Sequence, residues 1–132
     1  MNARFLLAVL AYVIPTFPLG YLWHLTIFKD YCEALGLYRT DIIIPFGIAS
    51  IQGDVWALIY SRLFAGERVI ARAAKFAALA FPLDWNFLVL VIAAKHHMTS
   101  VAGFVQIETA FMAIQYLVVS PLIALAFSFR KV

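Results

Sequence analysis

Four long apolar segments take up most of this 132-residue chain and restrict how it can fold. They cover about residues 5–27, 43–64, 69–94 and 101–127, and a helix needs only about 20 residues to cross ~30 Å of hydrocarbon. Transmembrane β-strands do not fit, because they are about 10 residues long and alternate in polarity. The sequence therefore predicts an all-α integral membrane four-helix bundle, with residues 1–132 as a single transmembrane domain.

The composition predicts a surface that faces lipid rather than water. Hydrophobic residues make up 65% of the chain and charged residues 13%, about half of the roughly 25% that soluble domains carry. The ten basic residues lie at the ends of the apolar segments, so membrane topology explains the net charge of +3 better than nucleic-acid binding does. We therefore expect the lipid bilayer as a partner, and no nucleic acid.

The distribution of Lys and Arg predicts the orientation in the membrane. Seven of these residues fall on one side, namely Arg4, Arg62, Arg68, Arg72, Lys75, Arg130 and Lys131. Three fall on the other side, namely Lys29, Arg39 and Lys95. Because basic loops stay in the cytoplasm, this bias places both termini on the cytoplasmic side of a bacterial inner membrane and argues against dual topology. The first segment has no small-x-small cleavage site after it, so we interpret it as a retained helix.

The residues between the apolar segments carry signals for helix starts and helix ends. Residues 28–41 carry apolar positions at helical spacing, which predicts an interfacial helix that Gly36 can end. Thr40 or Asp41 can cap the next helix, and the Thr-Ser pair at 99–100 can cap the last one.

Two rows of small residues predict close helix packing. Ala49, Gly53 and Ala57 recur at every fourth position of the second segment, and Ala74 and Ala78 do so in the third. Such rows let helix backbones approach closely in lipid.

Three carboxylates lie within the apolar segments at similar depth. Asp54, Asp84 and Glu108 are 11, 10 and 7 residues from the outer ends of their segments, or roughly 16, 15 and 11 Å at 1.5 Å per residue. An ionised carboxylate at such depth costs at least ~2.5 kcal/mol. We therefore expect all three to point into the bundle, one or more of them protonated, and to form a shared ligand- or proton-binding site. Gln115 lies two turns from Glu108 on the same face and, with His24, would support that site.

The three histidines form a second group on the outer side. His24 lies about one turn inside the first segment, and His96 and His97 follow the third segment beside Met98. Copper or zinc could bind such residues, and His24 could bind haem or a proton. The simpler alternative is a solvated histidine pair and an interfacial His24 that is hydrogen-bonded near the headgroups. The sequence names no cofactor, since it carries no dinucleotide, P-loop, metalloprotease or calcium-loop motif.

The stretch "FPLGYLWHLTIFKDY" resembles the opening of a family of small bacterial four-helix membrane proteins, a domain of unknown function. In that family a Gly, an aromatic pair and a Phe close the first helix, as Gly20, Trp23 and Phe28 do here, although His24 replaces one aromatic residue. The resemblance implies the four-helix layout and no activity.

Three functional hypotheses remain open. The first is a small membrane protein that handles a proton, a cation or a small molecule through the carboxylates. The second is a structural or assembly subunit of a larger membrane complex, with the carboxylates bonding helices together at ~0.6 kcal/mol per hydrogen bond. The third is a lipid- or quinone-modifying enzyme that uses the carboxylates as acid and base. The absence of a convincing Ser–His–Asp or Cys–His arrangement disfavours nucleophilic catalysis, and the small bundle favours a homo-oligomer.

Overall fold

The structure is a computed structural model that describes residues 3–36, 43–64 and 68–129, and for residues 43–47 the backbone alone. Its helices are α1 (Ala3–Leu22), η1 (Trp23–Ile27), α2 (Lys29–Leu35), α3 (Ile43–Leu63), α4 (Val69–Asp84), η2 (Trp85–Leu90), α5 (Val91–Lys95) and α6 (Val101–Ala126). The segments η1 and η2 are π-helical, with backbone bonds that run over five residues. The described ranges contain no strand, which confirms the all-α prediction.

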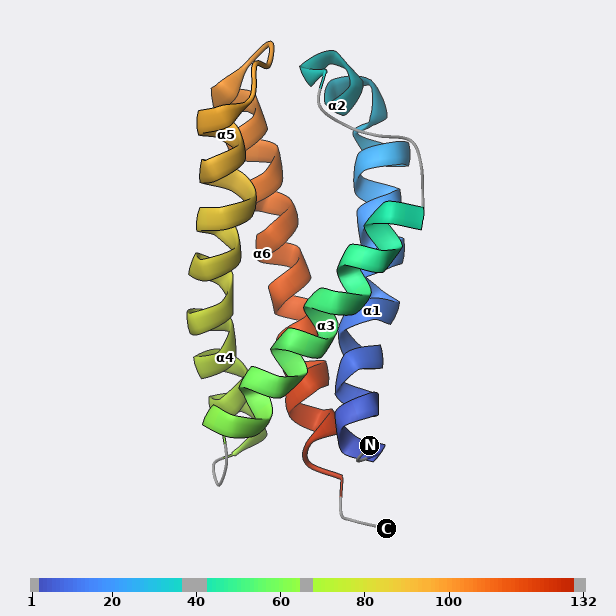
Figure 1. Cartoon of the computed structure of the whole chain (residues 1–132), viewed down its shortest axis with the longest axis vertical. Coiled ribbons are helices and arrows are strands. Elements are labelled where there is room, and N and C mark those ends of the chain that lie inside the picture. The colour runs from blue at the N-terminus through green and yellow to red at the C-terminus, as the bar shows by residue number, and fades with distance from the viewer. Residues whose placement is uncertain (1–2, 37–42, 65–67, 130–132) are drawn as a thin grey trace.

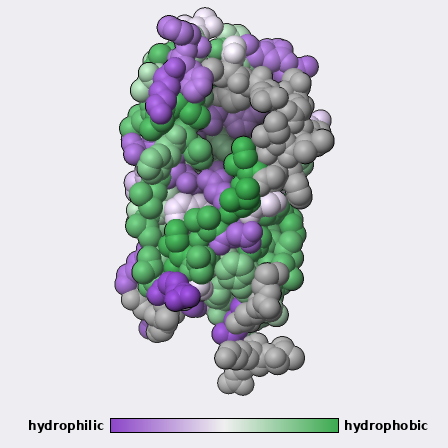
Figure 2. All heavy atoms as spheres, viewed as in Figure 1, coloured by the Kyte–Doolittle hydropathy of each residue, from purple (hydrophilic) through white to green (hydrophobic). Residues whose placement is uncertain are grey.

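Three helical stretches of the described chain are long and apolar enough to cross a membrane. They are Ala3–Ile27, Val69–Lys95 and Val101–Ala126. Large apolar side chains such as Ile14, Ile70 and Leu117 are exposed, and hydrophobic residues cover much of the face in Figure 2. Such a surface fits lipid rather than water. The four-span count and the cytoplasmic termini stay predictions.

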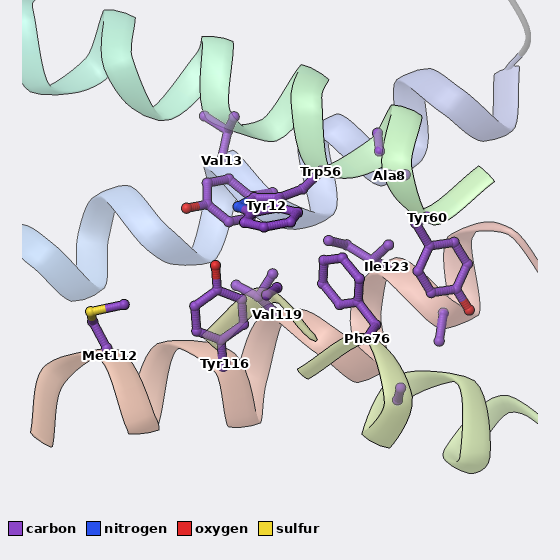
Figure 3. Packing of buried hydrophobic residues seen from close by; sticks show 14 of the residues in the cluster. Ala8, Tyr12, Val13, Trp56, Tyr60, Phe76, Met112, Tyr116, Val119 and Ile123 are labelled. Carbon is purple, nitrogen blue, oxygen red and sulfur yellow. The ribbon is translucent and has the colours of Figure 1, made fainter. Parts of the chain in front are cut away.

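The helices pack around the pair formed by α1 and α6. α3 packs on α1, and α4 packs on α6. In Figure 1, α1, α4 and α6 run roughly upright, whereas α3 crosses diagonally in front toward the beginning of α4; α1 begins at the same end of the molecule at which α6 ends. The core between these helices holds fully buried side chains, among them Tyr12, Tyr60, Phe76 and Ile123 (Figure 3).

The small residues of α3 allow its close contact with α1. Gly53 faces α1 so closely that a Cβ atom there would lie 3.3 Å from both Tyr12 Cδ1 and Val13 Cγ2. Ala49 and Ala57, one turn to either side, are buried. The packing role predicted for this row is therefore confirmed.

The small residues of α4 lie differently. Ala74 and Ala78 are exposed, whereas Ala73, Phe76 and Ala80 form the buried side of the helix. The expectation that Ala74 and Ala78 support packing within this chain is therefore wrong, because the larger Phe76 fixes which face of α4 meets α6.

The predicted helix ends are confirmed where they fall in described residues. Gly36 ends α2 in the left-handed conformation, with φ 77°, which glycine adopts without steric cost. Ser100 caps α6 by accepting a hydrogen bond from Gly103 N at 3.0 Å. The caps expected at Thr40 or Asp41 lie outside the described residues.

Candidate functional site

Asp84 is the centre of the larger polar cluster. Two side chains of α3 donate to its Oδ2 atom, Gln52 from Nε2 over 2.8 Å and Trp56 from Nε1 over 3.3 Å. Tyr116 of α6 donates its hydroxyl to the same oxygen. Oδ1 accepts no hydrogen bond among the described residues. It is also not one of the fully buried polar atoms that lack a partner, so it is at least partly exposed. One carboxylate oxygen is therefore held by three donors, and the other is left accessible.

A groove of about 320 Å³ opens at this carboxylate, between α3 and the junction of α4 with η2. Its lining residues are Ile48, Ile51, Gln52, Val55, Trp56 and Asp84. Ile51 is 67% exposed and Trp56 only 4%, so the apolar side chains of α3 form the rim and the polar cluster lies deeper. In Figure 2, hydrophilic atoms are visible in a hollow between hydrophobic surfaces.

The backbone around Asp84 departs from regular α-helix. Pro82 has no N–H group, so the carbonyl of Ala78 cannot receive the usual helical hydrogen bond from it. Directly after Asp84 the helix widens into η2, where Val91 N–H donates to Asn86 O, five residues earlier. Such π-turns are frequent at functional sites.

A tryptophan of η2 fixes this widened segment against α6. Trp85 Nε1 donates to Thr109 Oγ1 over 2.8 Å, and Thr109 in turn donates to Val105 O over 2.5 Å. The hydrogen bond holds the residue next to Asp84 and thereby restrains the position of the carboxylate.

His24 and Glu108 form a second, separate cluster between η1 and α6. His24 Nε2 lies 2.7 Å from Glu108 Oε1, and the two side chains are only 17% and 15% exposed. His24 Nδ1 lies 3.0 Å from Gly20 O. The edge of the imidazole also packs on Phe111, with ring centroids 4.8 Å apart.

The partners of His24 determine where its protons lie. A backbone carbonyl only accepts, so Nδ1 must carry a proton to bond Gly20 O. The 2.7 Å contact then requires one more proton between Nε2 and Oε1. With the imidazole charged and the carboxylate ionised, or with both neutral, the sum of the two charges is zero.

Gln115 bonds α6 to α1. It is 6% exposed, and its Nε2 atom lies 3.1 Å from Tyr12 OH and 3.2 Å from Thr16 Oγ1. Tyr12, Thr16, Gly20 and His24 are spaced four residues apart, which places them along one side of this helical stretch. Tyr12 and Thr16 of α1 and His24 of η1 thus contact α6 from the same side.

Asp54 does not join the other two carboxylates. Its side chain is exposed, and no partner for it is found within the described part of the chain. The expectation that Asp54, Asp84 and Glu108 all point inward to one shared site is therefore wrong. The physical reason is rotation. Each residue turns a helix by about 100°, so when Gly53 of α3 faces α1, its neighbour Asp54 points away from that contact.

The loop histidines do not join His24. His96 and His97 are exposed, and His96 Nδ1 lies 3.3 Å from Ile92 O. In the described ranges, no three His, Cys, Asp or Glu residues lie close enough together to hold a metal ion. The second cluster thus contains one of the three histidines that we considered as metal ligands.

The side chains that donate to Asp84 were not among the predicted site residues. These are Gln52, Trp56 and Tyr116. One signal was present, because Gln52 and Trp56 are four residues apart on α3 and therefore share a face.

The chain matches no protein-family model, no curated protein and no solved structure. The residues of the two clusters are therefore what a proposed function must be built on.

Proposed function

We propose that this chain is a small integral membrane protein that binds a proton or a cation at an intramembrane carboxylate, Asp84. The proposal rests on a difference in hydrogen bonding between the two carboxylate oxygens. Three donors bond Oδ2, while Oδ1 accepts no hydrogen bond within the described residues. An arrangement that served only to bond helices together would have no need to leave one oxygen accessible beside a groove.

The surroundings of Asp84 suit reversible binding. Asp84 lies eleven residues from the nearer end of the apolar stretch Val69–Lys95, or about 16 Å at 1.5 Å per residue. A bare carboxylate costs several kcal/mol in such a place, and the three donors to Oδ2 offset part of that cost. Protonation or cation binding at Oδ1 leaves all three hydrogen bonds to Oδ2 in place. The proton or cation can therefore bind and dissociate without a rearrangement of these side chains.

The proposed placement has four membrane-spanning helices in a bacterial inner membrane, with both termini in the cytoplasm. α3 has 21 residues, or about 32 Å of helix, which matches the ~30 Å hydrocarbon core. The seven-to-three distribution of basic residues supports the orientation. Reporter fusions at each terminus test it, and a reporter that is active only outside the cytoplasm should stay inactive at both.

Infrared spectroscopy of the purified protein in detergent tests the proton site. On titration we expect a carboxyl C=O band that changes with pH, that is absent in Asp84→Asn and that persists in Asp54→Asn. The second variant is a matched control, since it makes the same chemical change at the exposed carboxylate. A parent protein without any Asp84-dependent change in this band would refute the proposal.

An exposed row of small residues favours a second candidate function, that of a structural or assembly subunit. Ala74 and Ala78 on α4 are exposed, and small residues at a helix surface suit the approach of another membrane helix. Replacing both by Leu should then abolish co-purification with a partner or with a second copy, while Asp84→Asn should not. Unchanged co-purification of the Leu double variant would contradict this second candidate.

A further inference from the structure

We infer that the groove beside Asp84 binds a lipophilic organic cation, which reaches it from the bilayer and displaces a proton from Oδ1. The inference rests on the proposed function of Asp84 and adds the class of ligand. Three properties of the groove carry it: its apolar rim, its single accessible carboxylate oxygen and its depth in the membrane.

The rim of the groove suits an apolar body. Ile48, Ile51 and Val55 lie on one side of α3, line the groove, and are each about half exposed or more. The volume of about 320 Å³ lies within the range of known small-molecule sites. A ligand with hydrocarbon or aromatic groups can cover these side chains in place of lipid.

The deeper part of the groove suits a positive charge. Asp84 lines it, with Oδ2 held by the Tyr116 hydroxyl, and the hydrogen bond from Nε1 to Asp84 fixes the orientation of the Trp56 indole. Phe76 packs edge-on against the indole at 5.6 Å and restrains it further. A carboxylate held beside such a fixed side chain attracts a cation by its charge, and it repels an anion of the same shape.

An inorganic cation fits this site less well than an organic one. Mg²⁺ and Ca²⁺ require six or more oxygen ligands, whereas the lining side chains offer oxygens only from Gln52 and Asp84. A lipophilic cation carries no tight hydration shell that such ligands would have to replace. Of the two, the groove therefore selects the lipophilic cation.

The position of the groove determines how the ligand reaches it. The groove opens on the surface of a helical pair near the middle of an apolar stretch, where lipid rather than water surrounds a spanning helix. A membrane-dissolved ligand can therefore approach sideways. Because a proton and the cation compete for the same oxygen, one bound cation releases one proton, and the charge of the site is unchanged.

Binding of two ions of matched shape and opposite charge tests the inference. The probes are tetraphenylphosphonium and tetraphenylborate, added to the whole purified chain in nonionic detergent and measured by equilibrium dialysis and by proton release into weak buffer. We expect saturable binding of the phosphonium ion with release of about one proton, and no saturable binding of the borate ion. In Asp84→Asn, affinity for the phosphonium ion should fall about tenfold or more, whereas Asp54→Asn should bind as the parent does.

A second variant separates this inference from the proposed function. Ile51→Trp fills the rim of the groove without touching the hydrogen bonds of Asp84, and it should weaken phosphonium binding while the Asp84 infrared band remains. If parent, Ile51→Trp and Asp84→Asn all bind the phosphonium ion equally, or if the borate ion binds as well, the inference is overturned. An intact pH-dependent Asp84 band in that case would leave the proton site standing, and its loss would refute both.

Discussion

The His24–Glu108 pair makes a graded prediction for the stability of the bundle. Glu108→Leu removes the carboxylate that lies 2.7 Å from His24 Nε2 and puts an apolar side chain in its place, next to the imidazole that packs on Phe111. Breaking a fully buried ion pair costs about 3–5 kcal/mol, and a buried polar group without a partner costs about 1–3 kcal/mol. Since the two side chains are 17% and 15% exposed, we expect the free energy of unfolding to fall by about 2–3 kcal/mol.

Glu108→Gln should be much milder, for a reason that lies in the tautomer of His24. With Nδ1 donating to Gly20 O, a neutral imidazole presents the lone pair of Nε2 toward residue 108, and the amide NH₂ of Gln can donate to it. The hydrogen bond survives and only the charge contribution is lost, so we expect a loss of about 1 kcal/mol or less.

The assay is unfolding by sodium dodecyl sulfate in mixed micelles, followed by far-ultraviolet circular dichroism. Glu33→Leu is the matched control, because Glu33 forms a 3.8 Å pair with Lys29 but both side chains are 54% exposed; its effect should be about 0–0.5 kcal/mol. Equal losses for Glu108→Gln and Glu108→Leu would refute the assigned tautomer. A loss for Glu108→Leu as small as that of the control would refute the structural importance of the pair.

Two further substitutions test the packing of α1 against its neighbours by the same assay. Gly53→Leu should lower the free energy of unfolding by about 3 kcal/mol or more, because even a Cβ there lies 3.3 Å from Tyr12; Ala74→Leu on the exposed face of α4 should change it by less than about 0.5 kcal/mol. Gln115→Leu removes two hydrogen bonds to α1 and should cost about 1 kcal/mol. The exposed Gln106→Leu is its control, and an equal effect of the two would contradict the role of Gln115.

The helices were predictable from sequence because hydropathy and length determine them. Counting the π segments, the observed helical stretches begin and end within two residues of the predicted ones. The π segments themselves were not predictable, because they change the backbone bond from four residues to five without a distinct composition. Phe28 N, for example, bonds Trp23 O at 3.0 Å in a sequence that reads as ordinary apolar helix.

It was predictable that carboxylates lie within the apolar helices, but not which way each of them points. Counting residues placed Asp54, Asp84 and Glu108 at one level, yet level does not tell which way a side chain points. The row of small residues through Gly53 did fix the face of α3 that meets another helix, and it could have placed Asp54 to the side of that face. The pairing of His24 with Glu108 needed the contact of α1 with α6, and these helices lie at opposite ends of the sequence, where no short connection predicts that they are neighbours.

Asp84 and Glu108 both have partners in the apolar helices, but the chemistry of those partners differs. Glu108 meets a base, so its proton is shared with His24 and the pair is neutral in sum while the hydrogen bond holds. Asp84 meets three donors, an amide, an indole and a phenol. None of these groups acts as a base that could take a proton from the carboxyl or give it one in exchange. Neutralising Asp84 therefore requires a proton or a cation from outside the cluster. Of these two carboxylates, Asp84 is for that reason the one to which the proposed function assigns the binding of a proton or a cation.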